Sequence, residues 1–293
     1  MKLSVVTVLY GGLSVLESTL PSWQAASRDD VQFVFVDHST EAVDPVLNLS
    51  SWSTYVWNPK NPGFAEGANS AIQLATADRV LVLNPDVYLT AEALDSLVNC
   101  SSPLAAIGLR TGPDLFRGIE FTRWGFYRDR ASADSVLVGP SGGGALISLA
   151  LFAALGGYPD HLFAWGEDAE WALGAYSSGV RTTETSVVLD HVGGHSVASR
   201  DGQKFKARLL VRNRIATFRR ALGTDTQALL AIPFFLAILL NGFRKLRQGT
   251  AVEYFSGIRE GLTMQIPPAT YPKVDLRTWL ELTRVGGKKK QNT

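Results

Sequence analysis

The 293-residue sequence contains a single cysteine, and this scarcity excludes an intrachain disulfide and any metal site built from several cysteines. A lone Cys100 is typical of a protein from a reducing compartment. The apolar stretch from Leu3 to Leu9 is too short for a secretory signal, and no small-residue cleavage site follows it. We therefore expect a cytoplasmic protein.

Two nucleotide-binding signatures are also missing. The glycine-rich segments Gly142 to Gly144 and Asn61 to Phe64 are not followed by Gly-Lys-Ser/Thr, which disfavours a P-loop ATPase. No Gly-x-Gly-x-x-Gly follows the first apolar run, which disfavours a dinucleotide-dependent oxidoreductase. Both glycine-rich segments still permit a close approach between backbone and ligand.

The net charge of +1 hides an uneven distribution. Residues 1–202 contain 11 basic and 22 acidic residues, a net charge of −11, whereas residues 203–293 contain 17 and 5, a net charge of +12. This contrast predicts a catalytic domain over 1–202 and a basic, mainly helical extension over 203–293. A basic segment of this size is attracted to phosphate-rich surfaces such as anionic lipid. Since no nucleic-acid-binding module is recognisable, we expect no nucleic-acid partner.

Short β-rich runs alternate with helical patterns through the first two-thirds of the chain, which predicts an α/β sheet. We expect strands at 3–9, 32–36, 55–57 and 80–83, near 105–109, and ending near Leu189. We expect helices along the stripe Leu13, Leu16, Leu20 and Trp23, after Phe64, and over 91–98, 149–155 and 167–178. Residues 111–134 lack clean periodicity and are interpreted as a long functional loop.

Asp86 follows the apolar run Val80 to Leu83 and the pair Asn84-Pro85. The proline ends the strand and places the carboxylate at its carboxyl end, where α/β sheets bind ligands. A carboxylate there suits Mg²⁺ or Mn²⁺, which prefer oxygen ligands. The alternative interpretation of Asp86 is an ordinary turn residue.

Glu167 and Asp168 begin a helix directly after the aromatic loop Phe163-Ala164-Trp165-Gly166. The helix macrodipole favours carboxylates there, so helix capping is one interpretation. The same field keeps Asp168 ionised near pH 7, and an ionised carboxylate in a cleft accepts a proton from an attacking hydroxyl. Trp165 can stack on a sugar ring or pack in the core. His191, after a strand, is either structural or part of a metal or diphosphate site.

Six motifs occur in one order: SVVTVLYGG, FVDHS, NPGFAEGAN, LVLNPDV, the stretch GGGALISLALFAALGGYPDHLFAWGEDAEWALGAYSSGV, and HVGGHS. This order resembles family 2 glycosyltransferases of the GT-A fold, particularly bacterial rhamnosyltransferase-like members, over roughly Leu3 to Ser196. The resemblance implies an α/β fold with a mixed, mostly parallel central sheet, followed by a C-terminal helical extension.

The resemblance also implies roles for individual residues. Donor-nucleotide binding falls to Thr7, Leu9, Tyr10, Asp37, Asn61, Gly63, Phe64, Asn69 and Asn84. Metal binding falls to Asp86, the last residue of the family's Asp-x-Asp motif, and to His191. Asp168 matches the catalytic base, and Gly143, Gly144, Trp165 and Glu167 match the sugar and acceptor cleft. Two residues depart from the family: Asn84 stands where many members have the first Asp, and His38 replaces a frequent Asn.

By this resemblance the chain is an inverting glycosyltransferase that uses Mg²⁺ or Mn²⁺ and a nucleoside-diphosphate sugar. The expected donor is dTDP-rhamnose, with a UDP-sugar second, and the expected acceptor is a glycan or lipid-linked hydroxyl in polysaccharide or cell-wall biosynthesis. Two alternatives stay open: a non-catalytic carbohydrate- or nucleotide-binding protein on the same scaffold, and a nucleotidyltransferase.

The basic segment contains an apolar run from Ala228 to Leu240 that ends at Arg244, Lys245 and Arg247. The run is shorter than the roughly 20 residues that a bilayer span requires. We expect the helix to lie either in the inner interface of a membrane, which would make the protein peripheral, or against the catalytic domain. The tail from Gly286 to Thr293 is predicted to be disordered.

Overall fold

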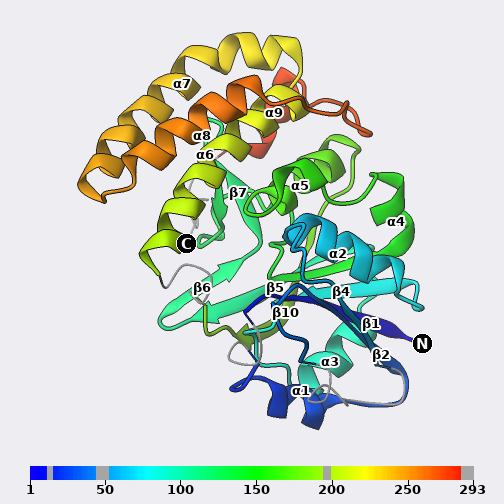
Figure 1. Cartoon of the computed structure of the whole chain (residues 1–293). Coiled ribbons are helices and arrows are strands. Elements are labelled where there is room, and N and C mark those ends of the chain that lie inside the picture. Colours follow the sequence, from blue (N-terminus) through cyan, green and yellow to red (C-terminus); the bar gives the residue numbers. More distant parts are fainter. Residues whose placement is uncertain (12–15, 44–52, 194–198, 285–293) are drawn as a thin grey trace.

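A computed structural model of the chain describes residues 1–11, 16–43, 53–193 and 199–284 (Figure 1). The strands are β1 (Leu3–Leu9), β2 (Val31–Asp37), β3 (Thr54–Trp57), β4 (Arg79–Leu83), β5 (Leu104–Thr111), β6 (Asp114–Arg117), β7 (Ile119–Phe121), β8 (Tyr127–Asp129), β9 (Gly144–Ser148) and β10 (Thr183–Asp190). The helices are α1 (Leu20–Ala26), α2 (Phe64–Gln73), α3 (Ala91–Val98), α4 (Leu149–Ala154), the 3₁₀ turn η3 (Asp160–Leu162), α5 (Glu167–Ser177), α6 (Arg200–Ala221), α7 (Thr224–Arg247), α8 (Ala251–Thr263) and α9 (Leu276–Leu282).

Among the described residues the central sheet has eight strands, in the order β10-β5-β9-β4-β1-β2-β3, with β6 paired to the last residues of β5, beyond those that pair with β9. The pairs β1–β2, β1–β4, β2–β3 and β5–β10 are parallel, whereas β9 runs antiparallel to both of its neighbours. The sheet is therefore mixed and mostly parallel, as predicted. The carboxyl ends of β1 and β4 and the start of β9 meet at one edge.

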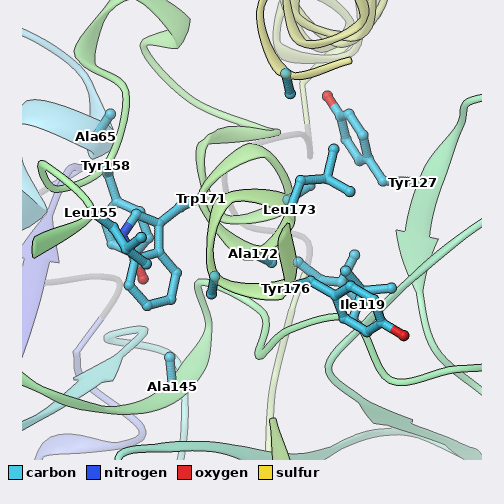
Figure 2. Close-up of a cluster of buried hydrophobic side chains, with 14 of the residues drawn as sticks. Ala65, Ile119, Tyr127, Ala145, Leu155, Tyr158, Trp171, Ala172, Leu173 and Tyr176 are labelled. Carbon is cyan, nitrogen blue, oxygen red and sulfur yellow. The ribbon is translucent and has the colours of Figure 1, made fainter. Parts of the chain in front are cut away.

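Helices cover both faces of the sheet, with α2, α4 and α5 on one side and α1 and α3 on the other (Figure 1). Strand β1 is apolar because it faces both layers: Val6 and Val8 join the α2–α5 core, whereas Val5 and Leu9 join the α1–α3 core. Helix α5 is itself central. Figure 2 shows Trp171 on one side of it beside Tyr158, and Tyr176 on the other side beside Ile119.

The C-terminal helices pack over α5 rather than standing apart. Glu170 of α5 is fully buried and is bound by Arg220, by the Thr217 hydroxyl (2.9 Å) and by the Tyr271 hydroxyl (3.2 Å). Helix α6 crosses the boundary predicted between Gly202 and Gln203. The division of the chain into two units stays a prediction.

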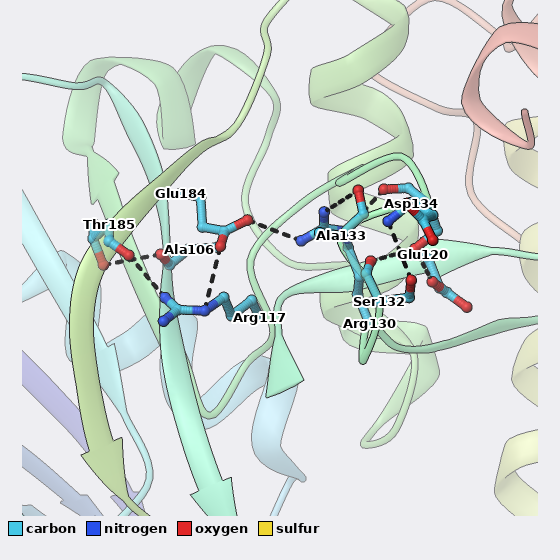
Figure 3. Close-up of polar contacts among 10 residues, drawn as sticks. Ala106, Arg117, Glu120, Arg130, Ser132, Ala133, Asp134, Glu184 and Thr185 are labelled. Carbon is cyan, nitrogen blue, oxygen red and sulfur yellow. Dashed lines mark hydrogen bonds and ion pairs between the residues drawn. The ribbon is translucent and has the colours of Figure 1, made fainter. Parts of the chain in front are cut away.

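The expectation of a long loop over 111–134 was wrong, because the segment forms three short strands. A turn at Gly112 returns β6 along β5, and β7 pairs with β8. Charge fixes this segment to the sheet: Glu184 of β10 accepts from Arg130 (2.9 Å) and pairs with Arg117 (3.3 Å), as Figure 3 shows. The irregular spacing of its apolar residues arises because its strands are only three or four residues long.

Two other sequence expectations need correction. Helix α1 begins at Leu20, with Pro21 in its first turn, so Leu16 lies before it and Leu13 lies outside the described residues. Helix α7 has 24 residues, roughly 36 Å, because polar residues at both ends extend the apolar run. By length and composition it is the one helix among the described residues that could cross a membrane, so a judgement from the apolar run alone does not hold for the whole helix. The predicted disordered tail also lies outside the described residues.

Candidate active site

A cleft of about 760 Å³ opens over the carboxyl ends of β1 and β4. The sheet edge supplies Tyr10, Asn84, Asp86 and Gly143, and the segment after β10 supplies His191. More of the lining comes from the start of α5, the aromatic loop before it and the first turns of α6. Of the residues predicted for the site, those that line the cleft are Tyr10, Asn61, Phe64, Asn84, Asp86, Gly143, Trp165, Glu167, Asp168 and His191.

Asp86 and His191 lie side by side, although 105 positions separate them. The His191 Nε2 atom is 3.1 Å from Asp86 Oδ1, and the Gly193 amide donates to Asp86 Oδ2 at 3.1 Å. A backbone bridge between Val87 and His191 holds the two segments together. The cleft therefore has a carboxylate and an imidazole in contact where the sequence predicted a metal site.

The chemistry of this pair fits a divalent cation. The Thr111 hydroxyl lies 3.2 Å from His191 Nδ1 and can donate or accept. In the tautomer protonated at Nε2 the ring donates to Asp86. In the tautomer protonated at Nδ1 it donates to Thr111, and the Nε2 lone pair is available to a cation. Mg²⁺ sites commonly use one or two carboxylates together with substrate phosphates, so few protein ligands suffice. Within the described part of the chain, no cluster of three or more His, Cys, Asp and Glu could hold a metal.

Asp168 faces the cleft from the first turn of α5 and accepts two backbone hydrogen bonds. The Gly142 amide donates to Oδ2 and the Ala169 amide to Oδ1, both at 2.7 Å. Burial raises the pKa of Asp168 to about 6, although these hydrogen bonds oppose the shift. Burial thus outweighs the helix-terminus field expected from sequence. The carboxylate stays mainly ionised at pH 7, and a base with a pKa near the working pH is well suited to proton transfer.

Glu167 is 4% exposed and its Oε2 atom has no hydrogen-bond partner among the described residues. Burial, and then the charge of Asp168, raise the pKa of Glu167 well above its ordinary value. The pKa values of the two neighbouring carboxyl groups therefore differ. Glu167 favours the neutral form, in which it can donate to a ligand, and Asp168 favours the ionised form.

The aromatic loop before α5 has an unusual backbone. Phe163 and Trp165 have φ values of 65° and 62°, a region that side-chain-bearing residues rarely occupy. The loop is held by Asn213 of α6, which is fully buried and whose Nδ2 lies 2.7 Å from the Ala164 carbonyl and 3.1 Å from that of Trp165. Gly63, with φ 102°, passes so close to Phe163 that a Cβ would lie 2.6 Å from its carbonyl oxygen. The loop is thus clamped from both sides.

Several predicted site residues are not among the described residues that line the cleft: Thr7, Leu9, Asp37, Gly63 and Asn69 of the donor-binding set, and Gly144 of the sugar and acceptor set. Asp37 ends β2 fully buried, where it accepts from the Ser39 amide (2.8 Å) and the Tyr55 hydroxyl (2.6 Å). The side chain of Asn69 binds both the amide and the carbonyl of Tyr158, at 2.9 and 2.8 Å. Their roles toward a nucleotide stay predictions.

Sequence reasoning missed the residues that α6 and β8 contribute. Phe205 and Lys206 of α6 and Asp129 of β8 line the cleft. The only signal was compositional, namely a basic helix after an acidic domain. Nothing in the spacing placed that helix over the site, because its contact with the aromatic loop depends on tertiary packing.

A protein-family model matches the first third of the chain. Residues 4–101 match the model of Glycosyl transferase family 2. This family 2 segment runs from β1 to the end of α3, so it includes Asn84 and Asp86 and leaves Asp168 and His191 outside. No curated protein matches the chain.

Solved structures resemble nearly the whole chain. A mannosyltransferase, PcManGT from Pyrobaculum calidifontis in complex with GDP-Man and Mn²⁺, is 15% identical, with a TM-score of 0.55 over 91% of this chain and 76% of that one. S. aureus TarS 1–349 in complex with UDP-GlcNAc is 16% identical, with a TM-score of 0.57 over 93% and 82%. At these identities the likeness shows the fold, which confirms the GT-A expectation. The family 2 match and the fold together support a glycosyltransferase.

Proposed function

We propose that this protein is an inverting glycosyltransferase that moves a sugar from a nucleoside-diphosphate donor to an acceptor hydroxyl. The observation that carries the proposal is that one cleft holds both an ionisable base, Asp168, and the oxygen and nitrogen donors of Asp86 and His191. The family 2 match and the GT-A fold support the same assignment.

The reaction is a single displacement. Asp168 accepts the proton of the acceptor hydroxyl as its oxygen forms a bond to the anomeric carbon. The bond from that carbon to the donor diphosphate breaks, and its electron pair leaves with the diphosphate oxygen. Because attack and departure occur on opposite faces, the configuration at the anomeric carbon inverts. Neutral Glu167 donates a hydrogen bond within the same cleft.

Asp86 and His191 are the residues that would hold Mg²⁺ or Mn²⁺, and the cation would supply positive charge to the leaving diphosphate. Since Asn84 replaces the first carboxylate of the motif, Asp86 is the only carboxylate in it. Asp86→Ala should abolish metal-dependent donor binding, whereas Asn84→Asp should strengthen it.

For the donor we propose dTDP-rhamnose first and a UDP-sugar second, with a glycan or lipid-linked acceptor and a role in polysaccharide or cell-wall biosynthesis. Residues 1–202 would carry the catalysis. A screen of dTDP-, UDP- and GDP-sugars for metal-dependent thermal stabilisation tests the donor, because a ligand that binds only the folded state raises the Tm. No stabilisation by any of them, with either metal, would contradict the proposal.

A second proposal concerns location: α7 docks the protein on an anionic membrane surface. One face of α7 is packed, through Leu230, Phe234 and Ile238. The opposite face exposes seven large apolar side chains at helical spacing: Leu229 (56%), Ile232 (82%), Leu236 (53%), Leu239 (52%), Leu240 (59%), Phe243 (66%) and Leu246 (58%). The last turn adds Arg244, Lys245 and Arg247. Basic charge beside an exposed apolar row is typical of a helix that lies in a membrane interface.

Flotation with liposomes that contain or lack anionic lipid tests this docking. Replacing Ile232 and Leu239 together by Glu should weaken binding at least about tenfold, because each buried side chain contributes about 1.5–3 kcal/mol. Leu74→Glu, which changes an exposed leucine at the end of α2, is the matched control. Equal flotation of all three proteins, or none with either lipid, would refute the proposal.

A further inference from the structure

We infer that Lys206 of α6 binds the diphosphate of the donor, so that the basic C-terminal segment completes the donor site. This inference rests on the proposed function and names a residue that the resemblance did not assign. It begins from the position of α6, whose first turns form one wall of the cleft through Ser199, Asp201, Gly202, Phe205 and Lys206.

Lys206 is a basic residue in a cleft that is lined mainly by acidic charges. Five carboxyl groups line it, from Asp86, Asp129, Glu167, Asp168 and Asp201, of which Glu167 favours the neutral form. Among the described lining residues, Lys206 is the one lysine or arginine. A diphosphate that enters so acidic a site is repelled unless cations compensate, and a cation at Asp86 neutralises only part of its charge. The lysine supplies positive charge from α6.

The ammonium group of Lys206 makes no salt bridge among the described residues, so it can bind a ligand. Its Nζ atom lies 5.6 Å from the centre of the Trp165 ring, and the charge of Asp129 acts on it. Burial raises the pKa of Asp129, and the charge of Lys206 opposes that shift. Within the described residues no salt bridge occupies the Lys206 ammonium, whereas its neighbour Lys204 pairs with Asp201 (3.6 Å) and Glu253 (3.8 Å).

A phosphate is the ligand that this geometry favours. An ammonium group on a flexible stem binds phosphate oxygens as a point charge, and the Trp165 face beside it suits a sugar ring. When the bond to the anomeric carbon breaks, negative charge grows on the leaving diphosphate, so a cation in contact with it is worth more in the transition state.

The test measures the binding of UDP, GDP and dTDP by calorimetry in the presence of Mn²⁺, with the unphosphorylated nucleosides as probes that lack the diphosphate. Lys206→Met should raise the Kd of the nucleoside diphosphate about 10- to 100-fold, since a hydrogen bond to a charged group is lost. Nucleoside binding should be unchanged. Lys206→Arg should restore most of the affinity, and Lys204→Met is the matched control, because Lys204 has the same charge on the same helix but lies off the cleft wall.

The outcomes distinguish a failure of the Lys206 assignment from a failure of the proposed function. If wild-type protein binds a nucleoside diphosphate and Lys206→Met binds it equally well, with Tm values that show both to be folded, the Lys206 assignment fails alone. A rise in acceptor KM without a change in nucleotide Kd would also overturn it, since the lysine would then serve an acceptor phosphate. If wild-type protein binds no nucleoside diphosphate, the proposed function fails as well.

Discussion

The acid side of the pH–rate profile should report the titration of Asp168. Burial raises the pKa of this carboxyl to about 6 from an ordinary 3.8. The base acts in its ionised form, so activity is lost as the pH falls through the raised value. With a pKa near 6 the ionised fraction is about 0.9 at pH 7 and about 0.1 at pH 5, which gives a roughly tenfold fall in kcat. With an ordinary pKa the fall over the same range would be about 10% or less.

The assay is kcat at saturating donor and metal between pH 5 and pH 8. Nucleoside-diphosphate binding is followed in parallel, so that a loss of metal or donor binding is separated from a loss of proton transfer. Asp168→Asn should lower kcat by about 10² or more with little change in donor binding. Its residual activity should lack the acid limb. An acid limb near pH 4 in the wild type, or full activity in Asp168→Asn, would refute the assignment.

Three further predictions concern the residues around this base. Asp129→Asn should move the acid limb to lower pH, because the charge of Asp129 raises the pKa of Asp168; an unchanged profile would show that the two do not interact. Glu170→Ala should lower the free energy of unfolding by about 3 kcal/mol or more, since it leaves a buried arginine unpaired, whereas Glu260→Ala, at an exposed pair, should cost about 1 kcal/mol or less in denaturant titrations. Asn213→Ala should lower kcat about tenfold more than it weakens nucleotide binding, because it frees the aromatic loop carbonyls; equal effects on both would argue for general damage.

The sheet was predictable because its strands carry their own signals. The run from Val80 to Leu83 is apolar on both faces and ends just before Asn84-Pro85, so its position and the placement of Asp86 after it follow from local rules. Helix α3 was predicted at its observed bounds, Ala91–Val98, since Thr90 caps it by accepting from the Ala93 amide.

Contacts across long sequence separations were not predictable from pattern alone. The approach of His191 to Asp86 was anticipated only through the family resemblance, because nothing local to either residue indicates the other. The clamp of Asn213 on the aromatic loop gave no signal, since a lone asparagine in a basic helix looks like a solvent-facing residue. The direction of the Asp168 pKa shift was also hidden, because burial depends on elements as distant as α6.

The most direct test of the central claim is to incubate the protein with nucleotide sugars, Mn²⁺ and a hydroxyl acceptor, and to follow the products by NMR. The account predicts free nucleoside diphosphate together with a glycoside whose anomeric configuration is opposite to that of the donor, and predicts that Asp168→Asn loses both. Exchange of the nucleotide with pyrophosphate would indicate a nucleotidyltransferase. Tight donor binding without turnover under every metal and acceptor would indicate a non-catalytic binding protein, and either result would contradict the account.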